Sequence, residues 1–378
     1  MSLFIGVPGF YYLYMRHYSE KPWNVKNEGD YFPPVTILVP VYNEEKIIQF
    51  KLENLARIDY PKDRLQIILV DDCSNDRSMR RIQEFKQSRP HVALETLNNS
   101  SRMGKTAGLN EALSLAKGEI VVISDADCFW PPDSLQKALG FLSDPSVGAV
   151  AGLEALLNPR DSWVTESEIL YNDAVHTIRT GESKIHSTIL FQGGLGAYKR
   201  SLLKSFDLEA DDSGTALNVV QKGVRTLLVS EAVYFTTSPN QWKEKIAIKS
   251  RRASQLVRLW FRCLKLSVKG ELRIPWKIFV PEAFLYLANP LIFPLIVFLS
   301  VIIAFENPVW LLGFATLLVV GFSFRKSRTL ILEVVQDHLV LLGAIFSSVL
   351  KKRISLWTTV RTSRASLSRR MLEEHGLV

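Results

Sequence analysis

Two aspartates separated by one residue, Asp125 and Asp127, follow the apolar run EIVVIS at 119–124. If that run is a strand, both carboxylates lie at the edge of a sheet, where they can share a hard divalent cation with a diphosphate. A nucleoside diphosphate leaves reluctantly until a cation neutralises the charge that develops on its oxygens. The spacing therefore predicts a Mg²⁺ or Mn²⁺ site suited to group transfer from a nucleotide.

Other charged residues stand at the ends of neighbouring segments. Asp71 and Asp72 end the apolar run QIILVD at 66–71, where a carboxylate can bind a base or a ribose hydroxyl, or cap the next helix. Arg102 and Lys105 precede a predicted helix, a position at which cationic side chains and the helix N-terminus favour phosphates. The GxxxxGK[ST] spacing is absent, which excludes a Walker A loop.

A second acidic pair, Asp211 and Asp212, opens a predicted helix within 209–223. An aspartate there can be an N-cap, or it can be a general base that takes the proton from an acceptor hydroxyl. No serine or cysteine forms a recognisable pair with a histidine, and the six histidines are scattered. Covalent catalysis is therefore disfavoured.

These residues need a sheet that brings strand ends together. Short apolar runs rich in β-branched residues predict buried strands at 35–40, 66–71, 92–97 and 119–124. Amphipathic stretches predict helices at 44–58, 76–88 and 105–116, and later ones near 164–183 and 240–268. Strand–helix alternation predicts an α/β fold with a doubly wound sheet that binds ligands at the carboxyl ends of its strands.

The C-terminal half is more apolar and more basic. Residues 240–268 carry eight lysines and arginines interleaved with aromatic and aliphatic residues. This pattern suits the headgroup layer of an anionic membrane, and it also fits a helix packed on the domain. Residues 278–305 and 308–324 are long enough to span a bilayer, and the basic cluster that follows them predicts a hairpin with both ends in the cytosol.

Two further apolar segments are harder to assign. Residues 329–350 contain Glu333 and Asp337 and precede the basic residues 351–353. We favour a re-entrant or interfacial helix there, with a third span as the alternative. Residues 3–15 are shorter than the roughly 20 residues of a spanning helix, which favours an interfacial or half-inserted anchor over a truncated transmembrane helix.

The composition of the chain limits the kinds of partner that it can bind. The 378 residues carry a formal net charge of +8, which indicates an anionic partner such as a phosphorylated ligand or a membrane surface. No nucleic-acid-binding motif is recognisable, so nucleic acid is not expected as a partner. The three cysteines show no CxxC or Cys/His spacing, which predicts a catalytic part in a reducing, cytosolic compartment.

Seven segments occur in a characteristic order: VPVYNEE, LVDDCSND, RMGKTAGLN, SDADC, GGLGAY, ADDSGTALNVVQKG and QLVRLW. Together they resemble the family-2 glycosyltransferases of the GT-A fold, which have a Rossmann-like mixed sheet. They look most like the membrane-integrated branch of cellulose, chitin, hyaluronan and poly-N-acetylglucosamine synthases. The likeness covers about residues 35–262 and extends to the membrane hairpin behind them.

The resemblance implies a role for individual residues. Donor and nucleotide binding would fall to Tyr42, Glu44, Asp72, Lys105 and Asp125. Asp125 and Asp127 would bind Mg²⁺ or Mn²⁺ with the diphosphate, and Asp212 would be the catalytic base. The motif QxxRW, which contacts the diphosphate and the acceptor, would correspond to Gln255, Arg258 and Trp260.

Two positions depart from the family pattern. An aspartate, Asp211, replaces the glutamate that precedes the catalytic base, and one residue is inserted between Arg258 and Trp260. On a helix one extra residue turns the ring by about 100°. Trp260 could then pack into lipid or core instead of holding a polymer, which weakens the expectation of a long-chain product.

The resemblance implies an inverting, metal-dependent transferase of the cytoplasmic membrane, whose catalytic domain faces the cytosol. It would move a sugar from a UDP- or GDP-sugar to a growing glycan. The alternatives are transfer of one sugar to a polyprenyl phosphate or other lipid, and an inactive nucleotide-binding scaffold. The expected segments are an anchor at 1–33, the catalytic domain at 34–238, an interface helix at 239–275, membrane helices at 276–350 and a basic cytosolic tail at 351–378.

Overall fold

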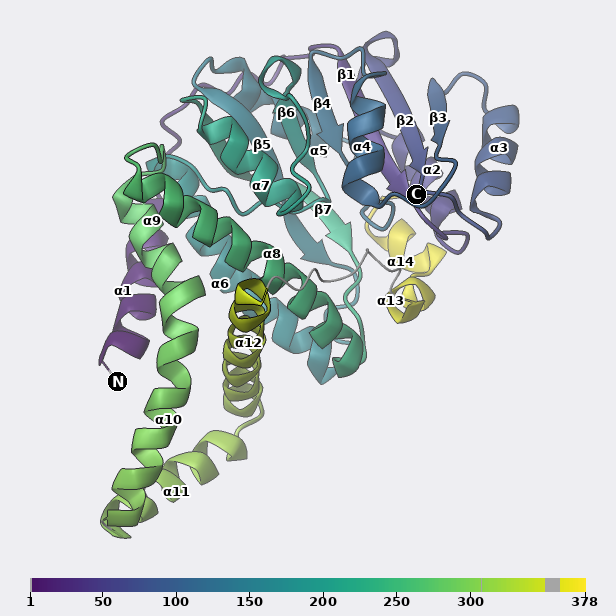
Figure 1. The fold of residues 1–378 in the computed structure, drawn as a ribbon. Helices are drawn as coiled ribbons and strands as arrows, with labels where there is room; N and C mark the ends of the chain where they lie inside the picture. Colours follow the sequence, from purple (N-terminus) through teal and green to yellow (C-terminus); the bar gives the residue numbers. More distant parts are fainter. Residues whose placement is uncertain (1, 307, 351–360) are drawn as a thin grey trace.

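A seven-stranded mixed sheet forms the upper part of the molecule in Figure 1. The computed structural model describes residues 2–306, 308–350 and 361–378. The strands are β1 (Val35–Val41), β2 (Leu65–Asp71), β3 (Leu94–Asn98), β4 (Ile120–Ile123), β5 (Val147–Leu156), β6 (Gly196–Lys199) and β7 (Arg225–Thr236), in the order β3-β2-β1-β4-β6-β5-β7. The predicted doubly wound α/β fold with a mixed sheet is confirmed.

The order of the strands creates a switch point between β1 and β4. The strands β1, β2, β3 and β4 are parallel, whereas β6 runs antiparallel to β4 and β5. From β1 the chain builds outward to β2 and β3, then returns to place β4 on the other side of β1. Loops leave such a point in opposite directions and open a crevice at the carboxyl ends of the two strands.

Helices cover both faces of the sheet, which explains why β1 is buried along its whole length. Ile37 and Val39 face the core formed with α2 (Ile48–Ala56), α3 (Ser78–Ser88) and α5 (Ser134–Leu139). Leu38 faces the opposite core, formed with α4 (Lys105–Leu113), α7 (Asp211–Val220) and α8 (Trp242–Val268). A strand covered on both faces has continuous apolar residues instead of alternating ones.

The helix expected at 44–58 begins later, at Ile48. Asn43 adopts a left-handed conformation with φ of 53°, and the Glu44 amide donates to the Ser78 hydroxyl at 2.8 Å. These interactions hold the residues after β1 in a bend, which aims Glu44 toward the end of β4.

The N-terminal segment is one helix, α1 (Ser2–Ser19), packed on α6 (Trp163–Ile185). The Tyr11 hydroxyl donates to Glu182 at 2.6 Å, and Gly181 lets the Met15 backbone approach so closely that a Cβ would lie 2.2 Å from its carbonyl oxygen. Leu3, Ile5, Phe10 and Leu13 on the same helix are exposed. One side of α1 is therefore part of the protein core and another is apolar and uncovered.

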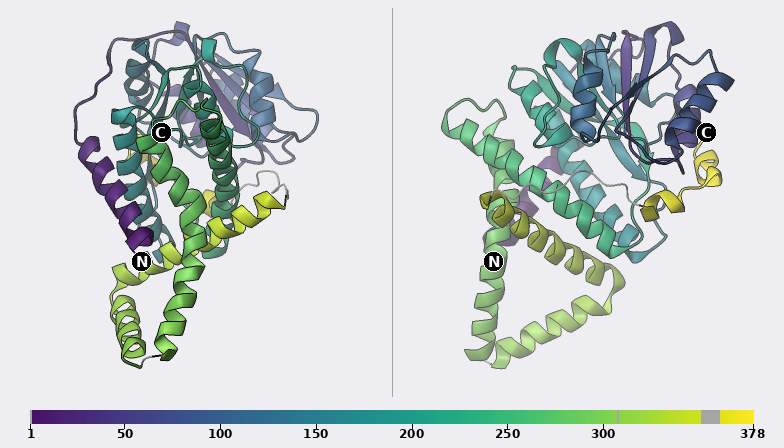
Figure 2. Two further views of the ribbon diagram at one scale, coloured as in Figure 1. Left: turned by 60° about the vertical axis from the view of Figure 1, so that its left-hand side comes forward. Right: turned by 45° about the vertical axis from the view of Figure 1, so that its right-hand side comes forward.

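Four C-terminal helices extend from the domain: α9 (Trp276–Ala283), α10 (Asn289–Glu306), α11 (Pro308–Ser323) and α12 (Arg325–Val349). A π-helical turn, Phe284–Ala288, joins α9 to α10. Figure 2 shows α10 and α11 projecting away from the sheet, with α12 returning along α8. By length and composition, Trp276–Glu306 and Ser327–Ser348 are suited to cross a membrane. The predicted span at 308–324 is not among them, because α11 has 16 residues.

The basic helix α8 pairs with the acids of α12. Lys245 lies 3.0 Å from Glu333 and 3.0 Å from Glu168, and Lys249 lies 2.8 Å from Asp337. These two lysines therefore neutralise acids inside the protein, which differs from the expectation that the basic face of this helix meets lipid headgroups.

The end of the chain packs on the catalytic domain. Two short helices, α13 (Arg361–Ser366) and α14 (Arg369–Glu374), lead to Leu377, whose carbonyl accepts a 2.8 Å hydrogen bond from Asn54 of α2. Leu372 and Leu377 are buried against Phe129. The expected basic cytosolic tail is thus in part a docked segment, whereas its first residues, 351–360, lie outside the described ones.

Candidate active site

Strained loops surround the switch point. Outside glycine, Asn43, Cys73 and Asp211 have positive φ angles of 53°, 63° and 47° among the described residues. Asn43 and Cys73 follow β1 and β2, and Asp211 opens α7. Such conformations cost free energy and gather at functional sites.

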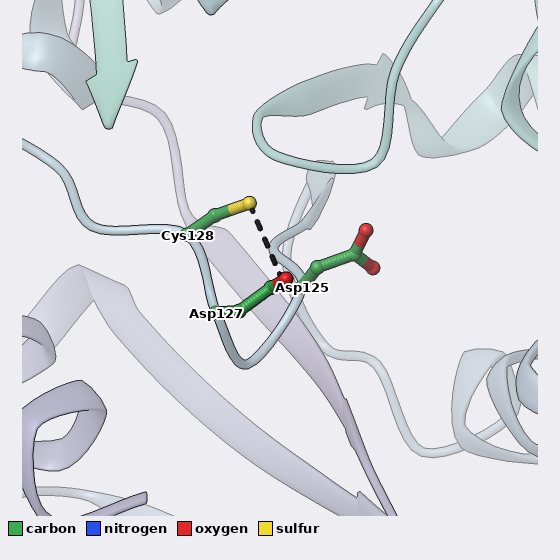
Figure 3. A group of neighbouring side chains, drawn as sticks. All are labelled: Asp125, Asp127 and Cys128. Carbon is green, nitrogen blue, oxygen red and sulfur yellow. Dashed lines mark hydrogen bonds between the residues drawn. The ribbon is translucent and has the colours of Figure 1, made fainter. Parts of the chain in front are cut away.

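The loop after β4 holds three possible metal ligands (Figure 3). The ligand atoms of Asp125, Asp127 and Cys128 all lie within 4.8 Å of one another. Burial raises the pKa of the Cys128 thiol well above its usual value, which disfavours the thiolate form that binds metals. The two carboxylates offer the oxygen ligands that a hard cation such as Mg²⁺ or Mn²⁺ prefers.

Lys105 joins the metal-binding loop to the second acidic pair. Its ammonium lies 2.8 Å from Asp125 and 3.3 Å from Asp212. Burial alone would lower the pKa of Lys105, but the carboxylates of Asp125 and Asp212 raise it above the ordinary value. A Cβ on Gly193 would lie 2.4 Å from the lysine nitrogen, so this glycine in the predicted Gly-rich turn makes room for the pair.

Asp211 and Asp212 both line the central cavity, and they have different partners. Asp211 accepts hydrogen bonds from Thr106 and, at 2.8 Å, from Gln255. Asp212 contacts Lys105 and is otherwise enclosed, so burial raises the pKa of its carboxyl to about 6. Of the two aspartates, Asp212 has the properties of a proton acceptor near neutral pH.

The residues expected at the nucleoside lie in the loops after β1 and β2 and before α4. The Asp72 carboxylate accepts hydrogen bonds from the amides of Met103 at 2.8 Å and Gly104 at 2.9 Å. The guanidinium of Arg102 lies 4.0 Å from the centre of the Tyr42 ring. Asp72 thus holds the loop before α4 in place, and Tyr42 and Arg102 offer an aromatic and cationic surface beside it.

Arg364 of the docked C-terminal segment enters the same site, which the sequence did not predict. It bonds Glu44 at 2.8 and 2.9 Å and also pairs with Asp127. Burial alone would lower the pKa of Arg364, but Asp127 and Glu44 raise it above the ordinary value. The arginine therefore stays charged and occupies a carboxylate that was expected to bind metal.

Replacing Arg364 by Ala is expected to lower the melting temperature by several degrees. The Glu44 side chain is fully buried, and leaving one partner of a buried ion pair alone costs about 3–5 kcal/mol. The matched control is Arg369→Ala in the same segment, because Arg369 pairs with Glu53 but is half exposed. Thermal unfolding of the purified proteins measures both; equal melting temperatures would contradict a structural role for Arg364.

The three residues expected to form the QxxRW site do not lie together. Gln255 lines the cavity and bonds Asp211. Arg258 donates to the Glu209 carbonyl at 3.1 Å and is not part of the cavity wall. Trp260 is buried against Phe279 and Tyr286, whose ring centre lies 5.9 Å away. The inserted residue turns Trp260 into the core, and Trp260 is not part of the cavity wall.

A cavity of about 360 Å³ connects these groups to the C-terminal helices. At the sheet edge its wall contains Lys105, Asp125 and Asp212, and on the other side it contains Tyr286 and Leu341. A ligand in this cavity can therefore touch both the carboxylates of Asp125 and Asp212 and the helices that are apolar enough for a membrane.

Comparison with known proteins agrees with this geometry. Residues 36–206 match the family described as Glycosyl transferase family 2. The structure resembles that of the mannosyltransferase PcManGT from Pyrobaculum calidifontis, solved in complex with GDP-mannose and Mn²⁺. The two share 32% sequence identity over 93% of this chain and 97% of that one, with a TM-score of 0.80.

Two curated relatives have different products in their names. The beta-monoglucosyldiacylglycerol synthase of Synechocystis sp. is 31% identical over 36% of this chain. The poly-beta-1,6-N-acetyl-D-glucosamine synthase of Staphylococcus epidermidis is 28% identical over 54%. This chain spans 29% and 49% of the length of these two proteins. Sequence, fold and nearly complete coverage of a solved relative agree, and the chain belongs to glycosyltransferase family 2.

Proposed function

We propose that the chain is an inverting, metal-dependent glycosyltransferase that moves a sugar from a nucleotide-diphosphate sugar to an acceptor at the membrane. The observation that carries this proposal is the convergence of Lys105, Asp125 and Asp212 in one cavity. This convergence supports the proposal, because a proton acceptor, a cation and a metal ligand are the groups that such a transfer needs at one reacting carbon.

The donor side is formed by the loops after β1, β2 and β4. Tyr42 and Arg102 would flank the nucleoside, and Asp125 and Asp127 would hold Mg²⁺ or Mn²⁺. The metal, when bound, neutralises charge on the leaving diphosphate. The Pyrobaculum mannosyltransferase was solved with GDP-mannose and Mn²⁺, which makes this pair the first donor and metal to test.

On the acceptor side Asp212 acts as the base. Its carboxylate takes the proton of the acceptor hydroxyl, whose oxygen forms a bond to the anomeric carbon while the bond from that carbon to the diphosphate breaks. The diphosphate leaves with the bonding electron pair, and Lys105 lies beside it as a cation. A single displacement inverts the configuration, so an α-linked donor gives a β-linked product.

A lipid acceptor fits the cavity better than a growing polysaccharide. Residues of the C-terminal helices line the cavity, and Trp260, expected to hold a polymer, is in the core. The diacylglycerol named in the Synechocystis relative also supports a lipid. Polysaccharide synthesis remains a second candidate, supported by the likeness to the Staphylococcus synthase and hence to the synthase branch of the family.

The test is a donor screen on the full chain in detergent with membrane lipids and Mn²⁺ or Mg²⁺. UDP- and GDP-sugars are tested for nucleoside diphosphate release, and labelled products are extracted with organic solvent. We expect one labelled species in the organic phase with one donor. A ladder of water-soluble products would instead support the polymer, and no release from any donor would support an inactive scaffold.

The membrane arrangement is part of the proposal. We propose that α10 enters the bilayer and that the catalytic domain, about residues 34–238, faces the cytosol. Although α12 is long enough to span, Glu333 and Asp337 pair with lysines of α8, and a helix tied in this way fits the interface better than the bilayer centre. The segments 239–275 and 276–350 would then form one interface region.

The rate of sugar transfer should fall at acidic pH. Because burial raises the pKa of Asp212 to about 6, the carboxylate is available above that pH and is lost as the pH falls through it. We expect kcat to fall about tenfold per pH unit below roughly 6. A pH profile of kcat under saturating donor and metal measures this. A value of kcat that stays constant from about 1.5 pH units below this pKa to about 1.5 units above it would contradict Asp212 as the base.

A further inference from the structure

The wall of the central cavity holds three arginines without an ion pair among the described residues. They are Arg179 of α6 and Arg251 and Arg252 of α8. Within the described part of the chain, no carboxylate lies within 4.0 Å of their guanidinium groups. Arg179 is only 6% exposed, and its Nε has no hydrogen-bond partner. A buried cation without a partner is costly, so the site is built for an anion that comes from outside the chain.

Most acids of the same wall have ion-pair or hydrogen-bond partners other than these arginines. Asp125 and Asp212 share Lys105. Glu168 pairs with Lys245, and Asp337 pairs with Lys249.

Two wall acids have other partners. Asp211 is bonded to Gln255 and Thr106. Glu282 lies beside Glu182.

Burial alone would lower the pKa of Arg252, but the charges of Glu154 and Glu168 raise it. Arg179, whose buried Nε has no hydrogen-bond partner, and Arg251 are therefore the arginines that an external anion would stabilise most.

The two arginines of α8 also repel each other. Burial, together with the neighbouring charge of Arg252, lowers the pKa of Arg251. A bound anion would relieve both effects. Guanidinium groups bind phosphate oxygens through paired hydrogen bonds, which makes a phosphate or diphosphate the anion of best fit.

The apolar part of the cavity wall indicates which kind of molecule carries this phosphate. Beyond the arginines the cavity is lined by Leu285 and Tyr286 of the π-helical turn and by Val340 and Leu341 of α12. These belong to the helices that are apolar enough for a membrane. The anion would thus be attached to a hydrocarbon chain that leaves the cavity along these helices.

The phosphate group of the acceptor does not fit at the catalytic end of the cavity, where the attacking oxygen must lie. The catalytic end of the cavity contains three carboxylates, Asp125, Asp211 and Asp212, which would repel an anion, and Asp212 as a base serves a neutral hydroxyl. The phosphate therefore fits at the arginines, with a hydroxyl of the same acceptor reaching Asp212.

We propose that Arg179, Arg251 and Arg252 bind the phosphate or diphosphate group of a lipid-linked acceptor. This inference rests on the proposed sugar transfer and names the class of its acceptor. A diacylglycerol, which carries no anion, would leave all three arginines unpaired.

Binding to the full-length protein in detergent tests the proposal without any metal or turnover. The probes are farnesyl diphosphate, farnesol and inorganic diphosphate, measured by calorimetric titration. Farnesyl diphosphate is expected to bind more tightly than either of the others. The variants Arg251→Gln and Arg252→Gln should each weaken it roughly ten- to a hundredfold and leave farnesol binding unchanged.

Two variants complete the design. Arg252 is exposed and lines the cavity, so its replacement should fold even if Arg179→Gln, at a buried position, does not. Lys265→Gln, an exposed position on the same helix, is the matched control and should not change any affinity.

Three outcomes would overturn the proposal. If farnesyl diphosphate and farnesol bind with equal affinity, the cavity has no anion site. If inorganic diphosphate binds as tightly as farnesyl diphosphate, the site takes free anions and does not recognise a lipid. Arginine variants that weaken GDP binding with Mn²⁺ by the same factor would place these residues at the donor. If donor hydrolysis persists in any of these cases, the proposed sugar transfer stands while this inference fails; without hydrolysis by the wild type, the proposed function itself fails.

Discussion

Replacing Asp212 by Asn is expected to reduce kcat by roughly 10²–10⁴-fold, the usual contribution of a general base. Asparagine keeps the size of the side chain and removes the proton acceptor. The affinity for the nucleotide with Mn²⁺ should change little, because Asp212 contacts Lys105 and is not one of the expected metal ligands. Steady-state transfer assays and nucleotide titration measure the two effects separately.

The matched control is Asp211→Asn. Asp211 has a positive φ of 47°, a conformation that asparagine also tolerates, and its bonds to Thr106 and Gln255 are structural. This variant should retain most of the turnover. If Asp212→Asn keeps full activity while Asp211→Asn loses it, the base is Asp211 and the assignment is reversed.

Replacing Asp127 by Ala should abolish the contribution of Mn²⁺ to donor affinity, a loss of at least about 100-fold, since even partners that only orient a metal ligand contribute 10–100-fold. The change removes one of two hard oxygen ligands from the loop after β4. Titration of GDP with and without Mn²⁺ measures the result, and a Mn²⁺ effect equal to that of the wild type would refute the metal site.

Asp127→Ala also takes a partner from Arg364, so two controls are needed. The double variant Asp127→Ala with Arg364→Ala should show the same loss of Mn²⁺ dependence, which separates metal binding from the docking of the C-terminal segment. Cys128→Ser should leave the affinity for Mn²⁺ nearly unchanged, because a hard cation prefers the oxygen ligands of Asp125 and Asp127 to a buried sulfur.

The central strands and the loops that follow them were predictable for a simple reason. β1 and β4 are buried on both faces, so they appear in the sequence as continuous apolar runs with polar residues directly behind them. In a parallel sheet these ends meet at one edge, and the positions of Asp125 and Asp72 follow from topology alone. The bounds were less accurate where a bend replaced a helix, as at Glu44.

The ion pairs between distant segments were not predictable. Arg364 is 320 residues from Glu44, and nothing in the local pattern of either residue marks the other. Glu333 and Asp337 likewise look unfavourable in an apolar helix until α8 supplies Lys245 and Lys249. A charge pair of this kind depends on how whole elements pack, and a sequence pattern describes each element alone.

By itself, then, the sequence determined the order of the first four strands and the helices between them, the acidic loop after β4 and the second acidic pair at the start of α7, because each depends on residues close together in the chain. The tertiary structure decided which of these groups meet. It placed Lys105 between Asp125 and Asp212 and turned Trp260 into the core. It also left three arginines unpaired in a cavity beside apolar helices, since burial and charge balance depend on neighbours from many separate segments.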